Sequence, residues 1–221
     1  MDERPLRRDA ERNRQLLLRT ALALMARDGL GVSYEKIARE AGTGTGTVYR
    51  RFPERLDLVD ALFAEHVDAV VDLARQACRA DDPWEGLTWF MTRQFELEAE
   101  NRGLGELLRS GGQSSELVVR GRARITPLVA ELVERAVRAG HLPRGVVPGD
   151  LVAVHLMVGA VMDAARQVDP NLWRRSLAVA FAGLRHAELP GDPPDEHVID
   201  RLYGVAPATP EKKAAHRDTA Q

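Results

Sequence analysis

Apolar residues recur every three or four positions along most of the chain, which is the spacing of one face of an α-helix. Asp28-Gly29 is typical of a helix end, and Pro83 suits the first turn of a helix. The pattern gives no convincing strand and no internal repeat, so we expect an all-α fold. The predicted helices cover about 10–27, 33–41, 45–52, 55–80, 83–101, 104–110, 116–139, 148–168 and 170–187.

The first three predicted helices form a recognisable unit. Two short helices joined by a tight glycine turn follow one longer helix, as in the helix-turn-helix unit whose last helix enters the major groove of DNA. Ala38 is small where two helices must cross, and Gly42 permits the positive φ of the turn. Val48 and Phe52 are expected to face the three-helix core. The sequence therefore predicts an N-terminal DNA-binding unit.

The outward residues of this unit suit DNA. Gly46 lets the backbone approach phosphates or base edges, and Arg50 or Arg51 can donate to a guanine edge or to a phosphate. Ser33 and Arg55 begin helices whose N-terminal amides and charge would hold flanking phosphates. The expected DNA-binding residues are Ser33, Thr43, Gly44, Thr45, Gly46, Thr47, Tyr49, Arg50, Arg51 and Arg55.

The charged residues are distributed unevenly along the chain. Residues 1–56 carry 12 Lys and Arg against 8 Asp and Glu, whereas the rest of the chain carries 19 against 25. The whole chain has a net charge of -2, which argues against a general polyanion binder. The net positive charge lies where the DNA-binding motif lies.

The stretch Ile37-Ala-x-x-Ala-Gly42, followed by Gly46-Thr-Val-Tyr49 and Phe52-Pro53, resembles the TetR family of transcriptional regulators. The resemblance implies a homodimeric repressor that binds a double-stranded DNA operator and responds to a small-molecule effector. It also implies that Thr47 and Tyr49 lie near the phosphates.

The chain departs from the family pattern just before Gly46. The family commonly has Ser and then Lys or Arg there, whereas this chain has Gly44 and Thr45. The departure removes a helix cap and a cation. We therefore expect Thr43 to cap the recognition helix, and the grip on DNA to depend more on the arginines at positions 50, 51 and 55.

Three parts are expected along the chain: a helix-turn-helix domain over 1–56, a helical effector-binding and dimerisation domain over 57–188, and a mostly disordered tail over 189–221. The tail is rich in Pro, Gly and charge, with little periodic apolar content. Val198, Ile199, Leu202 and Tyr203 are the exception and could dock as one short helical turn.

Pro148–Val168 is apolar around its whole circumference, which predicts burial on two sides. One side would face the subunit core and the other a partner, since the resemblance implies a two-fold interface made by the last two helices. The alternative is the central core helix of a monomer. A dimer matches a palindromic or near-palindromic operator, because it doubles a weak footprint across two half-sites. The expected interface residues are Val154, Val158, Val161, Val179 and Gly183.

The resemblance also implies a ligand pocket in the helical domain. The candidate residues are Phe63, His66, Trp89, Phe90, Arg93, Phe95, Leu128 and His155. Each of these residue types is more often a core residue than a ligand contact, and His155 is interpreted first as a satisfied core or interface histidine. The run Arg120, Arg122 and Arg124 is interpreted as a solvated helix face. Ligand binding would displace the long helix over 55–80 and change the spacing of the two recognition helices.

Other classes of protein are disfavoured. The sequence has no Gly-rich phosphate loop, no nucleophile elbow and no metal-ligand spacing, so neither an enzyme nor a cofactor is expected. The different-class alternatives are an architectural DNA binder and a helical enzyme without a recognisable motif. The single Cys78, the charged first fifteen residues and the lack of about eighteen consecutive apolar residues predict a cytoplasmic protein with no membrane partner.

Overall fold

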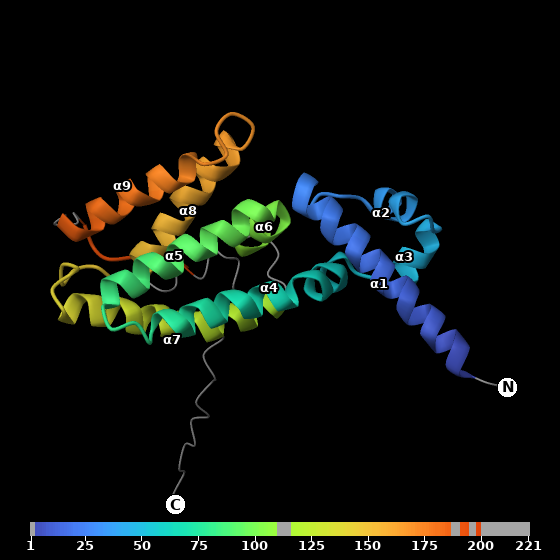
Figure 1. Cartoon of the computed structure of the whole chain (residues 1–221), viewed down its shortest axis with the longest axis horizontal. Helices are drawn as coiled ribbons and strands as arrows, with labels where there is room; N and C mark the ends of the chain where they lie inside the picture. The colour runs from blue at the N-terminus through green and yellow to red at the C-terminus, as the bar shows by residue number, and fades with distance from the viewer. Residues whose placement is uncertain (1–2, 110–115, 187–190, 195–197, 200–221) are drawn as a thin grey trace, which may run out of the picture.

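The computed structural model describes residues 3–109, 116–186, 191–194 and 198–199. These residues form helices without strands, which confirms the all-α prediction. Figure 1 shows α1, α2 and α3 as a lobe on the right, from which α4 runs into a bundle with α5 to α9. The helices are α1 (Glu3–Asp28), α2 (Tyr34–Glu40), α3 (Thr45–Arg51), α4 (Arg55–Ala77), α5 (Pro83–Glu100), α6 (Arg102–Arg109), α7 (Glu116–Arg138), α8 (Pro148–Ala165) and α9 (Leu172–His186).

Helix ends differ from the periodic pattern by a few residues where side chains close them. α4 ends at Ala77, and Arg135 of α7 then donates hydrogen bonds to the carbonyls of Cys78 and Ala80, the latter at 2.6 Å. Asp82 caps α5 by accepting from the amides of the next turn. α1 starts at Glu3, earlier than the expected Ala10.

The first hydrophobic core lies under the N-terminal lobe and reaches beyond it. Leu17, Met25, Ile37 and Val48 are buried there together with residues of α4 and α6. The α4 and α6 contributors are Leu58, Val59, Leu62, Phe63, Leu104 and Leu107. The lobe is therefore packed on the bundle through a shared core, and the boundary after residue 56 stays a prediction.

α6 docks against the C-terminal end of α1. Gly103 lies against the Met25 carbonyl and the Phe63 ring, where a Cβ would come within 3.0 Å of both. Glu106 occupies the space that a side chain on Gly29 would need, and Gly29 also has φ +83°. Glu106 Oε2 accepts a hydrogen bond from the Leu30 amide at 2.6 Å. The contact thus fixes the turn between α1 and α2 to the bundle.

The second core fills the bundle. Phe95 and Trp173 are almost completely buried, with ring centroids 5.7 Å apart, and pack with residues of α4, α5, α7 and α8. Pro127 lies inside α7. Because proline has no amide hydrogen, the helix lacks one internal hydrogen bond at that point.

α8 has two distinct long faces. Among the described helices it alone has the length and composition of a membrane span, with a mean hydropathy of 1.3 over 18 residues. One face, including Leu151 and Met162, is buried in the bundle. The opposite face carries Ala153, Met157 and Ala160, and Met157 is 59% exposed. The helix is apolar around its circumference because one apolar face lies in the core and a second apolar face lies on the surface.

Candidate functional site

The turn of the helix-turn-helix unit has the geometry that the sequence predicts. Ser33 caps α2, and its side-chain oxygen accepts a hydrogen bond from the Lys36 amide at 3.3 Å. Gly42 has φ +66°, a conformation that side chains other than glycine rarely adopt. The Thr43 amide donates to the Ala38 carbonyl at 2.9 Å and closes the end of α2.

The prediction that Thr43 caps the recognition helix is wrong. The N-cap of α3 is Gly44, and no side chain supplies a capping hydrogen bond. The Gly44 carbonyl accepts from the Thr47 amide at 2.8 Å. The first-turn amides of α3 therefore lack a side-chain cap from this position, because glycine at the N-cap brings no oxygen acceptor.

Tyr34 joins the recognition helix to its neighbours. It is buried, and its hydroxyl lies 2.9 Å from the Phe52 carbonyl and 3.1 Å from that of Glu54. Its ring packs edge-on against Tyr49 with centroids 4.7 Å apart. Burial raises the pKa of Tyr34, so the hydroxyl keeps its proton at neutral pH. One side chain thus fixes the end of α3 and the entry to α4.

The outward face of α3 is accessible. Gly46, Tyr49, Arg50 and Arg51 are exposed, Tyr49 by 51%, while Thr45 and Thr47 are half-buried. Arg50 Nη2 donates to Thr47 Oγ1 at 3.0 Å, so its guanidinium lies over the first turn of α3. A Cβ on Gly46 would lie 3.6 Å from Arg50 Nη1, which shows how close this guanidinium comes to the helix backbone.

Arg55 is directed inward rather than toward a flanking surface. It donates a hydrogen bond to the Leu30 carbonyl, and its guanidinium carbon lies 5.6 Å from the Tyr34 ring centroid. Burial lowers the pKa of this arginine. These contacts pack the half-buried Arg55 against the α1–α2 turn and Tyr34 of α2, and its expected contact with a phosphate stays a prediction.

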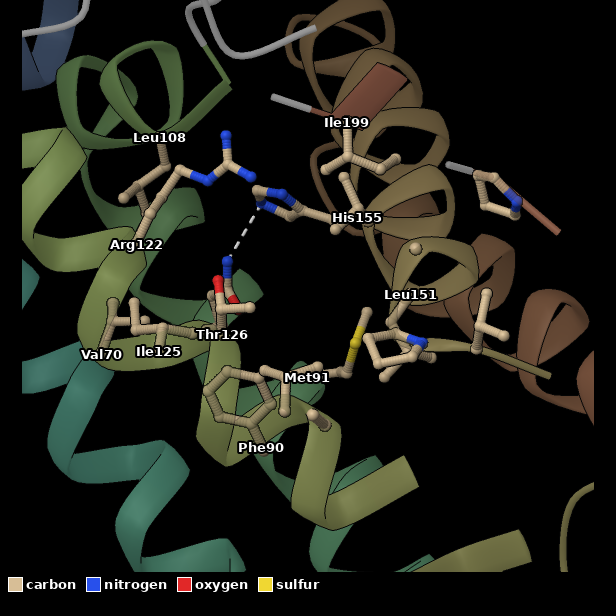
Figure 2. A pocket seen from close by; sticks show the side chains of 18 of the residues that line it. Val70, Phe90, Met91, Leu108, Arg122, Ile125, Thr126, Leu151, His155 and Ile199 are labelled. Carbon is tan, nitrogen blue, oxygen red and sulfur yellow. Dashed lines mark hydrogen bonds between the residues drawn. The ribbon is translucent and has the colours of Figure 1, made fainter. Parts of the chain in front are cut away.

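A pocket of about 580 Å³ lies in the bundle, between α5, α7 and α8. Figure 2 shows Arg122 and His155 at one end in that view, with Phe90 and Met91 at the other. Most of its lining is apolar. The lining residues are Val70, Phe90, Met91, Gln94, Leu108, Arg122, Ile125, Thr126, Val129, Ala130, Val147, Pro148, Gly149, Leu151, Val152, His155, Pro193, Pro194 and Ile199.

A buried polar network lies behind the His155 end of the pocket. His155 Nε2 is 2.7 Å from Glu98 Oε1 and 3.1 Å from Gln94 Nε2. Glu98 is fully buried, and its second oxygen accepts from Arg109 of α6. Arg109 also binds Asp163 at 2.9 Å. The network links the pocket wall to α6.

The structure places the candidate ligand residues in different parts of the molecule. Phe90 and His155 line the pocket. Trp89 and Arg93 lie instead in a shallow hollow on α5, and Phe95 is buried between His155 and Trp173. Phe63 lies in the N-terminal core with His66 beside it, their ring centroids 5.7 Å apart, and Leu128 packs on the second core.

Two parts of the pocket were missed by the sequence reasoning. Arg122, interpreted as part of a solvated face, lines the pocket, whereas Arg120 and Arg124 are exposed. Pro193, Pro194 and Ile199 of the tail also line it. Ile199 is 7% exposed, in agreement with the docking turn expected there, but Leu202 and Tyr203 lie outside the described residues.

The interface prediction is wrong for two residues. Val154 and Val158 are 3% and 2% exposed and belong to the second core of the subunit itself. Val179 is 62% exposed on α9, and a Cβ on Gly183 would meet nothing within 4 Å. Val161 is half-buried.

Within the described part of the chain, no group of three or more potential metal ligands occurs.

Comparisons with known proteins fit this architecture. A family model described as "Bacterial regulatory proteins, tetR family" matches residues 17–62, and a second, "Transcriptional regulator SbtR-like, C-terminal domain", matches residues 82–186. An HTH-type transcriptional regulator of Staphylococcus aureus is 33% identical over 110 residues, which are 48% of this chain. That alignment covers 58% of the length of the curated relative.

Two solved structures are also similar. A TetR transcription regulatory protein from Mycobacterium vanbaalenii is 34% identical, and the match covers 82% of this chain and 100% of that one, with a TM-score of 0.49. FadR from Bacillus subtilis, solved in complex with stearoyl-CoA, is 16% identical with a TM-score of 0.58, covering 76% of this chain and 98% of that one, so it shows the fold alone. The two family models, which together match more than half of the chain, establish that it belongs to the TetR family of bacterial regulatory proteins.

Proposed function

We propose that this protein is a homodimeric transcriptional repressor that binds operator DNA through α3 and is released by a small molecule held in the pocket. The observation that carries the DNA-binding part is the accessible face of α3. Gly46, Tyr49, Arg50 and Arg51 are exposed on a short helix that Tyr34 and the Gly42 turn fix to the lobe. Such a helix can enter the major groove with its side chains at the base edges.

Dimerisation is supported by the outward face of α8 and α9. Met157, Val179 and Leu172 are 59%, 62% and 40% exposed, and α8 adds small exposed alanines at 153, 160 and 164. Large apolar side chains exposed on neighbouring helices are candidates for an interaction site. A second copy of the chain is the occupant that would pair two recognition helices, since a two-fold interface is self-complementary.

Effector binding is supported by the pocket and by its link to the DNA-binding lobe. A volume of about 580 Å³ lies in the range of small-molecule sites. The stearoyl-CoA complex of FadR is a precedent for a ligand in this fold. From the pocket, contacts run through His155, Glu98 and Arg109 to α6. A turn away on α6, Glu106 binds the Leu30 amide of the lobe. A ligand that moved α6 would therefore act directly on the α1–α2 turn.

The DNA-binding proposal is tested by changing the two exposed arginines of α3. Sequences selected from random DNA give the operator, and fluorescence anisotropy then measures its affinity over a series of salt concentrations. If Arg50→Ala or Arg51→Ala removes a base contact, operator affinity falls by about 1 to 3 kcal/mol. If the arginine binds a phosphate, affinity falls evenly across sequences and the salt slope decreases by about one.

Arg75→Ala is the matched control, because Arg75 is exposed on α4 far along the chain from α3 and pairs with Asp72 at 2.9 Å. It should leave operator affinity unchanged. Unchanged binding by the double variant Arg50→Ala/Arg51→Ala would contradict the role of α3. Equal affinity for all sequences would favour an architectural DNA binder.

A further inference from the structure

Arg50 belongs to the last turn of α3, but its guanidinium lies over the first turn. Long side chains on a helix point back toward its N-terminus, and Arg50 follows this rule. Its Nη2 donates to Thr47 Oγ1 at 3.0 Å, and a Cβ on Gly46 would lie 3.6 Å from its Nη1. The charge of Arg50 therefore lies beside the first turn of α3, the part of a recognition helix that contacts base edges.

The Arg50 guanidinium is accessible to DNA. Arg50 is exposed, and the exposed Gly46 beside it has no side chain that could cover it. Within the described part of the chain, the guanidinium is bonded to the Thr47 hydroxyl and to no carboxylate. Because this hydroxyl is neutral, it orients the guanidinium without cancelling its charge.

The helix that carries this pair is itself fixed to the lobe. Val48 is 0% exposed and holds one side of α3 in the first core. The Tyr34 ring packs against the Tyr49 ring with centroids 4.7 Å apart. The lobe thus holds α3, and Thr47 holds the guanidinium on α3. A side chain that is held before binding loses less conformational freedom when it binds.

We propose that Arg50 reads a guanine in each operator half-site and that Thr47 is its positioning residue. The inference rests on DNA binding through α3, as proposed above. The planar fork of N–H donors of an arginine matches O6 and N7 of guanine in the major groove. One N–H group of Arg50 is bonded to Thr47, and the others remain for the base. A phosphate contact of Thr47, which the family resemblance implies, would instead act on all sequences alike.

The base assignment is tested on the operator selected from random DNA. Fluorescence anisotropy measures the affinity of the full-length protein for copies in which one guanine of each half-site is replaced by 7-deazaguanine. This base lacks the N7 acceptor but still pairs with cytosine. At one guanine the replacement should weaken binding of the parent protein at least about fivefold, while Arg50→Ala should not respond to it. If no guanine shows this difference between the two proteins, the base assignment is overturned.

A double-mutant cycle tests the role of Thr47. Thr47→Val removes the hydroxyl, but it keeps the branched shape and a similar helix propensity. It should weaken operator binding about two- to tenfold, because Arg50 must then be immobilised on binding. In the Arg50→Ala background it should have no effect. Thr47→Ser, which restores a hydroxyl, should recover most of the loss. Equal weakening in both backgrounds would show a separate phosphate contact and overturn the positioning role.

Thr45→Val is the matched control, since Thr45 is a half-buried threonine in the first turn of the same helix. Its effect on operator affinity, whatever its size, should be the same with and without Arg50. A dependence on Arg50 as large as that of Thr47 would overturn the pairing of Thr47 with Arg50. Far-UV circular dichroism checks the fold of each variant. If Thr47→Val does not fold, Thr47→Ala takes its place in the cycle.

This inference and the proposed function fail in different experiments. If the double variant Arg50→Ala/Arg51→Ala binds the operator like the parent protein, α3 is not the DNA contact and both are overturned. If Arg50→Ala instead loses affinity evenly for all sequences and its salt slope decreases, Arg50 binds a phosphate. In that case α3 binds DNA as proposed, and only the guanine assignment is overturned.

Discussion

Glu98 is the residue whose environment is least ordinary. Its side chain is 0% exposed, yet its carboxylate pairs with Arg109 and lies within hydrogen-bond distance of His155. Removing one partner of a buried ion pair leaves the other charge without compensation, at a cost of several kcal/mol. Replacing Glu98 by a neutral side chain should therefore cost more stability than neutralising a carboxylate on the surface.

We predict that Glu98→Gln lowers the free energy of unfolding by about 3 kcal/mol, measured by urea denaturation at pH 7. Glu96→Gln is the control on the same helix, where Arg93 and Arg174 contact a partly exposed carboxylate at 2.8 and 3.0 Å. Its loss should stay below about 1 kcal/mol. Equal losses in the two variants would show that the Glu98 network does not stabilise the fold.

Single positions were predictable where local backbone geometry decides them. Gly42 and Ser33 follow from the turn and the cap, and both predictions are confirmed. Positions whose burial depends on the rotation of a helix about its axis were not predictable. On α8 the apolar residues surround the helix, so periodicity could not tell buried Val154 from exposed Met157. Arg122 was missed because only its position at the pocket, which the tertiary structure sets, distinguishes it from its neighbouring arginines.

Between elements, Asp28 connects the end of α1 to α2. Its carboxylate accepts from Arg27 at 2.8 Å and from Lys36 at 2.9 Å. These two hydrogen bonds, that of Arg27 first, hold the pKa of Asp28 well below its usual range. A carboxyl whose pKa is depressed by folding stabilises the fold above its unfolded pKa of about 3.9, and that stability is lost as the pH falls below this value.

We therefore predict that wild type and Asp28→Asn differ in free energy of unfolding by a constant amount between pH 7 and pH 5. The difference should shrink as the pH falls toward 3. Below about pH 3.9 the unfolded chain protonates Asp28 while the folded protein keeps it ionised, and this protonation stabilises the unfolded state. Urea denaturation at each pH measures it. Asp72→Asn, which removes an exposed pair with Arg75 on α4, is the control for a surface pair. A difference that does not depend on pH would refute the contribution of Asp28.

Element identity was largely predictable, since each expected helix is present, and apart from the start of α1, seven residues earlier than expected, the ends lie within a few residues of the prediction. Long amphipathic segments and Gly or Pro boundaries carry that information locally. The ends that depend on tertiary partners were not predictable. Arg135, which binds the carbonyls beyond α4, lies more than fifty residues away in sequence.

For the molecule as a whole, the proposed dimer would bring two recognition helices together through the α8–α9 face. We predict that Met157→Glu combined with Val179→Glu converts a dimer to a monomer, because it places charges in the apolar contact. Size-exclusion chromatography with light scattering measures the mass, and operator affinity should fall with it. Val119→Glu, a change at a 38% exposed residue of α7, should leave a dimer. A monomeric parent protein at micromolar concentration would refute the interface.

The contact of Glu106 with the α1–α2 turn limits how the N-terminal lobe can move relative to the bundle. The carboxylate fills the place of a Gly29 side chain, and Gly103 lies against α1 near Met25. The Glu106 carboxylate and the Leu30 amide are hydrogen-bonded at 2.6 Å, so α6 and the α1–α2 turn are in direct contact. In the proposed response to a ligand, a movement of α6 would either carry the α1–α2 turn with it or break the hydrogen bond between Glu106 and the Leu30 amide.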